Sequence, residues 1–411
     1  MKLFISALLS FVLAVVSVVS VEAQNLSGDS ALIAYLSEQG VPVTTNNMVT
    51  LLKSGEEKFN DLLPLIASAR DYIHLEYFNF RNDSIAGLLF EALAERAGHG
   101  VEVRALFDDF GNMSNNRPLK EKHLKKIRES GIEIHAFDPI RFPYLNHIFH
   151  RDHRKIIVID GTIAYVGGIN IADYYIRGLP SIGEWRDMHL RIEGDAVDHL
   201  QNIFASIWNK VSKRKIDCGK YLRRHAKAKD KTVAIVDREP HKLPKLLRET
   251  YVRSIASAQK QIRIVNPYFI PTRRIRSELK RALERGVKVE IMISAKSDVK
   301  FTPDGVFHVA NKLRKLGADV YVYEPGFHHS KVMTIDSLFC TVGSANLDSR
   351  SLYCDYEVNA FIFDEQITGD IAAIFESDKT RSFMLTSDVW KKRSKWRRFV
   401  GSIAYLLYPF L

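Results

Sequence analysis

The chain has 411 residues, of which 46% are hydrophobic and 26% charged. This length predicts two domain-sized units, and the composition excludes a disordered, collagen-like or polytopic membrane protein. Two short segments carry the formal net charge of +11: residues 210–231 hold ten Lys or Arg against two Asp, and residues 391–398 hold six basic residues and no acid. Together they carry +14, so the rest of the chain sums to −3 and no nucleic-acid partner is expected.

The N-terminus has the pattern of an export signal. Lys2 precedes an apolar run over residues 3–21, and the small residue Ala23 follows at a plausible cleavage position. We expect residues 1–23 to be a cleaved signal peptide or a retained signal anchor, with a buried core helix as the remaining alternative. In either of the first two cases the folded part is exported and membrane-associated on the extracytoplasmic face.

From residue 43 onward, short β-rich runs alternate with helical patterns, which is typical of an α/β fold, and we expect a mostly parallel sheet. The pattern then repeats along the chain. Matching pairs of segments are 73–78 with 262–269, 100–103 with 286–289, and 130–134 with 316–320. The chain is therefore predicted to be a duplication, with one repeat over residues 40–209, a basic linker over 210–231 and a second repeat over 232–389.

A set of polar residues recurs at a constant offset of 176 residues, first as His153, Lys155, Asp160 and Asn170, then as His329, Lys331, Asp336 and Asn346. One copy alone could be a chance match, but two copies in register, each with a Gly-Gly or Gly-Ser pair before the Asn, are not. The β-branched run between each Lys and Asp predicts a strand, with His and Lys on one face and the Asn on the next strand.

Each copy supplies half of a site for a phosphodiester. A histidine can act as nucleophile or acid, while a lysine and an asparagine donate hydrogen bonds to phosphate oxygens. If the halves pack about a pseudo-twofold axis, the two histidines face each other across the phosphorus. One can then attack while the other protonates the leaving oxygen. The loop before the first motif is ten residues longer than its counterpart and carries residues 141–144, a predicted lip over the site.

A zinc site is the main chemical alternative in this region. His147, His150 and His153 are spaced by three residues, as metal ligands can be. No compact set of cysteines or carboxylates completes such a site, so no metal is expected. The three cysteines are too few for a disulfide framework, and pairing of Cys340 with Cys354 stays open.

These motifs resemble the phospholipase D superfamily, whose hallmark is two such His-Lys-Asp motifs, each followed by a glycine-containing element with Asn. Within it the chain is most similar to bacterial cardiolipin synthases of the two-motif type, over nearly all of residues 40–411. Further stretches carry the resemblance: residues 72–77, 183–187, 266–271 and 343–351. The resemblance departs at the front, because those enzymes usually begin with two membrane spans and this chain has one signal-like segment.

The resemblance implies a duplicated α/β/α sandwich, two repeats about a pseudo-twofold with one shared active site, and transfer through a phosphohistidine without a cofactor. His153 and His329 match the catalytic histidines. The phosphate binders match Lys155, Asn170, Lys331 and Asn346. Asp160 and Asp336 complete the motifs, with a structural role expected, and Asp187 and Glu357 match the carboxylates that orient each histidine, with an ordinary surface pair as the alternative.

The implied activity is that of a cardiolipin synthase, which joins two phosphatidylglycerol molecules and releases glycerol. The alternatives are a phospholipase D that uses water as acceptor, a nuclease, and a membrane-surface binding protein with an inactive site. The last is disfavoured because both copies of the motif are intact.

The tail over residues 390–411 predicts how the protein meets an anionic phospholipid membrane. Six basic residues cluster around Trp396, and apolar residues follow at helical spacing. We expect one amphipathic helix from about residue 390 to 408, too short to span a bilayer and lying in its interface. The alternative is a helix that packs on the core.

Overall fold

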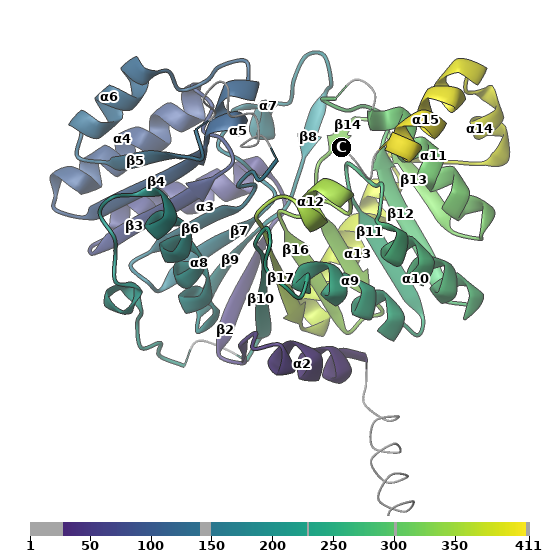
Figure 1. The fold of residues 1–411 in the computed structure, drawn as a ribbon, viewed down its shortest axis with the longest axis horizontal. Coiled ribbons are helices and arrows are strands. Elements are labelled where there is room, and N and C mark those ends of the chain that lie inside the picture. Colours follow the sequence, from purple (N-terminus) through teal and green to yellow (C-terminus); the bar gives the residue numbers. More distant parts are fainter. Residues whose placement is uncertain (1–27, 140–148, 228–229, 300–301, 408–411) are drawn as a thin grey trace, which may run out of the picture.

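The structure is a computed structural model that describes residues 28–139, 149–227, 230–299 and 302–407 (Figure 1). Its helices are α2 (Gly28–Glu38), α3 (Gly55–Ser68), α4 (Ser84–Gly98), α5 (Asp109–Ser114), α6 (Glu121–Glu129), α7 (Tyr174–Arg177), α8 (Ala196–Val211), α9 (Leu246–Ser257), α10 (Arg273–Glu284), α11 (Thr302–Lys315), α12 (Ser349–Tyr353), α13 (Glu365–Lys379), α14 (Ser387–Lys392) and α15 (Lys395–Leu407). None of the helices in these ranges is long and apolar enough to cross a membrane. The predicted export signal lies outside the described residues.

The strands form two large sheets and one small one. They are β1 (Val43–Thr44), β2 (Asn47–Leu52), β3 (Tyr72–Tyr77), β4 (Glu102–Asp108), β5 (Glu133–Phe137), β6 (Lys155–Ile159), β7 (Ile163–Gly167), β8 (Glu184–Arg186), β9 (His189–Gly194), β10 (Thr232–Arg238), β11 (Gln261–Val265), β12 (Lys288–Ser294), β13 (Asp319–Tyr323), β14 (Gly326–His328), β15 (Val332–Ile335), β16 (Phe339–Gly343), β17 (Glu357–Phe363) and β18 (Ser382–Met384). We call the part from β2 to β9 the first half and the part from β10 to β18 the second half.

The two large sheets have the same strand order, as a duplication requires. The first runs β2-β9-β7-β6-β3-β4-β5, and the second contains β10-β17-β16-β15-β11-β12-β13 in the corresponding positions. In both sheets the last three strands of this order are parallel and the others antiparallel. The second sheet has one extra strand at each edge, β1 and β18. The duplication predicted from the sequence is therefore present in the topology of the described residues.

The expectation of a mostly parallel sheet was wrong. In the two large sheets of the described residues, only β3, β4 and β5, and their counterparts β11, β12 and β13, are parallel neighbours. The motif strands are instead joined to the next strand by tight turns: β6 to β7 around Asp160 and Gly161, and β15 to β16 around Asp336. A turn of this length can connect only antiparallel strands, whereas a parallel pair needs a long crossover.

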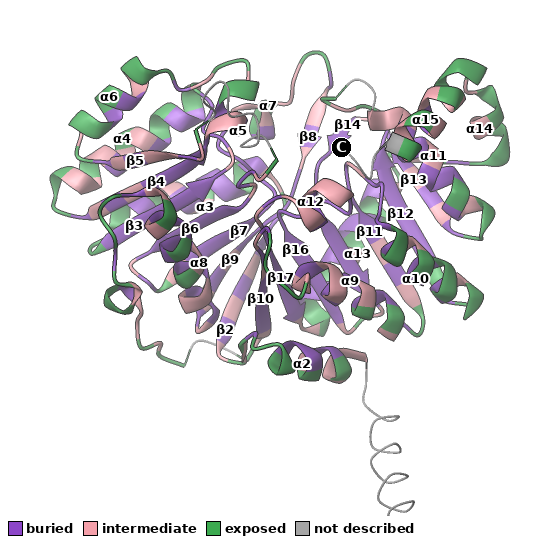
Figure 2. Ribbon diagram, in the orientation of Figure 1, coloured by how far each residue is buried: buried purple, intermediate pink, exposed green. Residues whose placement is uncertain are grey.

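The central strands of the two large sheets are buried between layers of helices (Figure 2). Helices α3, α4 and α6 pack on the outer face of the first sheet, and α2, α9, α10 and α11 on the outer face of the second. One core between the sheets is shared by both halves and contains α8, α13 and side chains such as Val158 and Val358. The halves therefore form one body, and the motif strands lie at its centre.

Two connecting segments tie the halves together. Helix α2 packs on α9, and β1 pairs with β10, so residues 28–44 lie on the second half although they precede the first half in sequence. The first repeat was predicted to begin at residue 40, but β1 at Val43–Thr44 belongs to the sheet of the second half. The predicted basic linker lies along the first half: the Tyr72 hydroxyl donates to the carbonyl of Tyr221 at 2.6 Å, and Arg223 pairs with Asp71 at 3.3 Å. Part of the linker charge is thus neutralised by acidic side chains.

The tail forms two helices rather than the single one expected. Helix α14 ends at Lys392 and α15 begins at Lys395, because the chain is extended at Arg393, whose guanidinium pairs with Asp304. Trp390 and Tyr405 pack against the core of the second half. One side of the tail therefore packs on the core, as the alternative prediction had it, while another side presents an exposed apolar face that is described below.

Candidate active site

Each motif histidine stands just before its motif strand and is held by the backbone of the opposite half. The N–H of His153 donates to the carbonyl of Tyr356 at 3.0 Å, and that of His329 donates to the carbonyl of Arg186 at 2.6 Å. Tyr356 and Arg186 are in turn the residues before Glu357 and Asp187. This reciprocal pairing brings each histidine next to a carboxylate that belongs to the other half.

The side chains of the two histidines also contact the opposite half. Nδ1 of His153 lies 3.0 Å from Oε1 of Glu357, and Nδ1 of His329 lies 2.7 Å from Oδ2 of Asp187. A carboxylate on Nδ1 holds the proton there and leaves Nε2 with its lone pair. Both predicted orienting residues are therefore in place, buried and bonded, rather than forming an ordinary surface pair.

The surroundings of the two histidines favour their neutral forms. Burial lowers the pKa of His153 well below its usual value, and the nearby Lys155 lowers it further. Burial and Lys331 lower the pKa of His329 to about 4, against the opposing effect of Asp187. Burial also raises the pKa of Glu357 to about 7, although Lys155 opposes that shift. Near neutral pH both imidazoles can therefore offer an unprotonated Nε2.

The motif lysines are buried beside the histidines. Lys155 donates to the carbonyl of His153, and Nζ of Lys331 lies 2.9 Å from each ring nitrogen of His329. Burial lowers the pKa of Lys155 to about 7 and that of Lys331 to about 8, while the orienting carboxylates counteract it. A bound anion would raise the pKa of both lysines and keep them charged, because a nearby negative charge stabilises a buried ammonium group. The pair is suited to hold a phosphate.

The two asparagines lie after the strands that follow the motifs, not on them as predicted. Strands β7 and β16 end at Gly167 and Gly343, three residues before Asn170 and Asn346. The intervening backbone packs closely: a Cβ on Gly168 would lie 2.3 Å from Oδ1 of Asp187, so only glycine fits there. The side-chain oxygens of both asparagines are buried with no hydrogen-bond partner among the described residues. The NH2 group of Asn170 donates one hydrogen bond to the Tyr175 hydroxyl at 3.0 Å, which leaves its second N–H for a ligand.

The motif aspartates stand apart from this group. Asp160 and Asp336 lie in the turns at the far ends of the motif strands, both at φ +51. Each carboxylate accepts three backbone N–H groups of the segment leading into the neighbouring strand, from residues 70–72 and 259–261 respectively. These contacts describe a structural role for both aspartates, which is the role expected for them.

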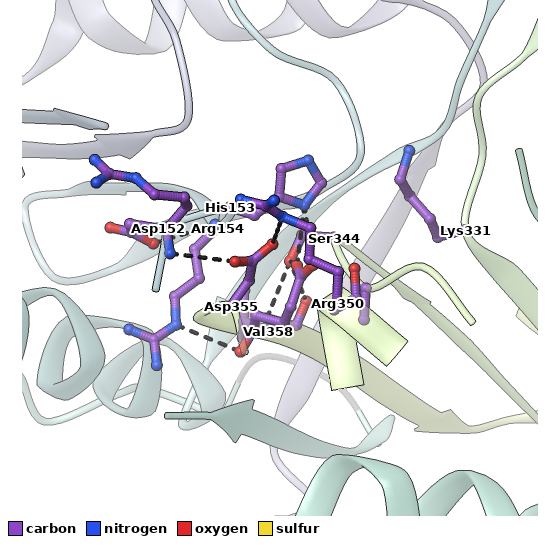
Figure 3. A network of polar contacts seen from close by, with 12 residues as sticks. Asp152, His153, Arg154, Lys331, Ser344, Arg350, Asp355 and Val358 are labelled. Carbon is purple, nitrogen blue, oxygen red and sulfur yellow. Dashed lines mark hydrogen bonds and ion pairs between the residues drawn. The ribbon is translucent and has the colours of Figure 1, made fainter. Parts of the chain in front are cut away.

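A polar network supports His153 from below (Figure 3). Ser344 donates to Glu357, and its own oxygen accepts the N–H of Val358 at 3.0 Å. Arg350 pairs with Asp355 at 3.0 Å, and Asp355 accepts the N–H of Arg151 at 3.2 Å. These contacts join the two halves beneath the histidine, so the ring and its carboxylate are held by several independent bonds.

The surroundings of the two histidines differ. His329 is enclosed by aromatic rings, with centroid distances of 5.3 Å to Phe327, 5.6 Å to Trp185, 6.2 Å to Tyr175 and 6.3 Å to Tyr268. His153 has Phe78 at 5.0 Å, and its side chain is 15% exposed against 6% for His329. The motif pattern did not single out these aromatic residues, because they lie outside it in sequence.

Some predicted features fall elsewhere. Within the described ranges, no group of three or more His, Cys, Asp or Glu is arranged to hold a metal ion. His150 lies with Nδ1 3.0 Å from the carbonyl of Cys354, and His153 binds Glu357. The predicted lip at 141–144 and His147 lie outside the described residues. Cys218, Cys340 and Cys354 are all free thiols, which answers the open question of a Cys340–Cys354 pair.

Comparisons with known proteins agree with this arrangement. Residues 62–208 and 251–379 match the family described as "Cardiolipin synthase, PLD-like domain". The chain is 38% identical over 374 residues to cardiolipin synthase 2 of Staphylococcus epidermidis, and this match covers 90% of this chain and 75% of that protein. It is 39% identical over 374 residues to a cardiolipin synthase of Staphylococcus aureus, covering 90% and 74%.

Solved structures show the same fold at low sequence identity. The crystal structure of phosphatidylserine synthase from Haemophilus influenzae superposes with a TM-score of 0.71 at 15% identity, over 91% of this chain and 99% of that one. Polyphosphate kinase from Porphyromonas gingivalis superposes with a TM-score of 0.54 at 13% identity, over 80% of this chain and 46% of that one. The duplicated α/β architecture predicted from the sequence is confirmed.

Proposed function

The chain belongs to the cardiolipin synthase family of the phospholipase D superfamily and is a phosphatidyltransferase, and from this we propose that it makes cardiolipin from two molecules of phosphatidylglycerol. The observation that carries the proposal is the reciprocal placement of each histidine on the carboxylate of the opposite half. It supplies two oriented imidazoles for one phosphodiester, which is what a two-step transfer requires.

In the first step Nε2 of one histidine attacks the phosphorus of phosphatidylglycerol, and the bond from phosphorus to the glycerol oxygen breaks. The other histidine gives its proton to that oxygen, and glycerol leaves. We assign the attack to His153 and the proton to His329. The 2.7 Å contact between His329 and Asp187 supports this choice, because a close carboxylate stabilises the imidazolium that must donate. The phosphodiester anion itself raises the pKa of His329 when it binds.

In the second step the hydroxyl of another phosphatidylglycerol attacks the phosphohistidine. His329, now neutral, takes the proton of that hydroxyl, and the bond between phosphorus and nitrogen breaks. Cardiolipin leaves, and both histidines return to their starting forms. The two motif lysines and the amides of Asn170 and Asn346 hold the phosphate oxygens, whose charge grows in each transition state.

The acceptor decides between this reaction and simple hydrolysis. The aromatic enclosure of His329 supports a lipid alcohol as acceptor, since His329 takes the proton of the acceptor and the apolar rings around it limit the entry of water. We further propose that the reaction takes place at an anionic phospholipid membrane, on the extracytoplasmic face. The N-terminal export pattern and the basic tail of the sequence support that location.

Product analysis tests the proposal. The purified full chain is incubated with phosphatidylglycerol in mixed micelles, and lipid and water-soluble products are quantified by mass spectrometry. We expect one cardiolipin and one glycerol for every two phosphatidylglycerol molecules consumed. Phosphatidic acid as the sole lipid product would make the protein a phospholipase D instead. The variant His199→Ala, which changes a histidine of α8 outside the site, is the control and should keep its turnover.

A further inference from the structure

Helix α15 is fixed to the second half by one of its faces. Gly401 lies so close to α11 that a Cβ there would be 2.4 Å from the carbonyl oxygen of Asp304. The ring of Tyr405 lies 4.0 Å from Nζ of Lys312 and 4.9 Å from the guanidinium of Arg276. Helix α15 is therefore seated against α11 in a defined orientation.

The opposite face of α15 is apolar and uncovered among the described residues. Its side chains are Trp396, Phe399, Ile403 and Leu406, which are 69%, 54%, 39% and 67% exposed. At about 100° per residue they fall within an arc of about 80°, on the side away from Gly401 and Tyr405. We call these four residues the α15 ridge. No other described helix or strand carries more than one exposed large apolar side chain, so the ridge is a distinctive surface.

Cationic side chains flank the ridge. Lys391, Lys392, Lys395 and Arg397 are exposed around its N-terminal end. The pair of Lys391 with Asp388, at 3.8 Å between two exposed side chains, neutralises little of this charge. Arg393, which the sequence grouped with them, is tied to Asp304 and does not contribute. An apolar strip beside clustered cations is the chemistry that an anionic lipid surface accepts.

The ridge belongs to the same end of the second half as the active site. Ala404 packs near Gly305, which lies close to Ile270. Two residues earlier, the ring of Tyr268 is 6.3 Å from that of His329, and its hydroxyl donates to Asp298 at 2.6 Å. Gly305 and Ile270 thus connect α15 with the surroundings of His329. A surface bound by α15 would therefore be held near the site.

We propose that the α15 ridge docks on an anionic phospholipid bilayer and holds the side of the site next to Tyr268 against the lipid headgroups. Helix α15 has 13 residues and is about 20 Å long, so it lies along the interface and does not span the bilayer. The ridge enters the boundary between headgroups and acyl chains while the lysines contact anionic headgroups. This inference rests on the proposed function only in naming the substrate that the docked site would meet.

Vesicle binding of the full chain tests the ridge. The double variant Trp396→Ser/Phe399→Ser should bind vesicles of phosphatidylglycerol and phosphatidylcholine at least about tenfold more weakly than the unchanged chain. Leu88→Ser, at an apolar position on α4 that is 52% exposed, is the control and should bind normally. Unchanged binding of the double variant would overturn the proposal. So would a change of oligomeric state in that variant without loss of vesicle binding, because a second copy would then cover the ridge.

A second variant separates the charge from the apolar contact. Lys391→Gln/Lys392→Gln/Lys395→Gln should weaken binding at low salt and reduce its salt dependence, while the apolar contribution persists. Retained salt dependence in this triple variant would count against the proposed role of these lysines.

Activity measurements separate this inference from the proposed function. With a water-soluble, short-chain phosphatidylglycerol the ridge variant should turn over like the unchanged chain, and with vesicles it should be slower. A protein that binds vesicles through the ridge but makes no cardiolipin would refute the proposed function and leave the ridge intact. Equal loss of turnover on both substrates in a folded ridge variant would refute the docking role.

Discussion

Replacing Asp336 should separate the structural from the chemical members of the motif. Its carboxylate accepts the N–H groups of Gln259, Lys260 and Gln261 at 3.0, 2.7 and 2.7 Å. These bonds fix the start of β11, which pairs with the motif strand β15. Asp336 also adopts φ +51, a conformation that alanine disfavours. The variant Asp336→Ala therefore loses three bonds and gains backbone strain.

The expected loss of stability follows from these contacts. Each hydrogen bond to a charged acceptor contributes about 1 kcal/mol net at a partly exposed turn, and the left-handed conformation costs alanine about 1 kcal/mol more. Asp336→Ala should therefore lower the free energy of unfolding by about 4 kcal/mol. Asp336→Asn keeps an acceptor oxygen and tolerates the positive φ, so its loss should be about half as large.

Urea denaturation followed by circular dichroism measures this loss, and turnover is measured separately at a temperature where each variant is folded. We expect Asp336→Ala to keep its turnover within about threefold, because its carboxylate lies at the far end of β15 from Lys331. Lys331→Ala is the matched control, with the opposite pattern of normal folding and lost turnover. Normal stability with abolished turnover in folded Asp336→Ala would show instead that this carboxylate takes part in the chemistry.

Three further predictions concern the site itself. Asp187→Asn and Glu357→Gln should each lower turnover by about a thousandfold with little loss of structure, seen by steady-state kinetics and circular dichroism. Competitive inhibition by inorganic phosphate should weaken as the pH rises past about 8, because Lys331, with a pKa of about 8, then loses the proton that binds the anion. Inhibition that does not change with pH would contradict this. Turnover should persist in EDTA, since lysine and asparagine donors hold the phosphate; loss restored by one divalent ion would contradict it.

The duplication was predictable because the spacing of residues within each motif is local and can be recognised in the sequence. Two copies of a rigid motif at a constant offset survive in sequence even when the surrounding residues diverge, and the common strand order of the sheets follows from them. The pairing of Glu357 with His153 has no such local signal. It depends on the bridge between Asp152 and Tyr356, residues about 200 positions apart, and resemblance alone suggested it.

The errors have physical causes as well. An alternation of helical and β-rich patterns does not show which consecutive strands are joined by a helical crossover and which by a tight turn. The number of parallel strands in each sheet was therefore overestimated. The contact of Arg393 with Asp304 stops the tail helix and cannot be seen from helical periodicity. The aromatic enclosure of His329 gathers residues from both halves, and their grouping requires the fold.

Trapping of the phosphoenzyme tests the central claim, that two histidines from the two halves serve one phosphodiester. Phosphatidylglycerol labelled at phosphorus is added separately to the unchanged chain, His153→Ala and His329→Ala, and protein-bound label is measured after acid-free quenching. We expect label to accumulate on His329→Ala, which can attack but poorly completes transfer, and to be absent from His153→Ala. Label on His153→Ala alone would reverse the two roles, and full turnover in either variant would contradict the site.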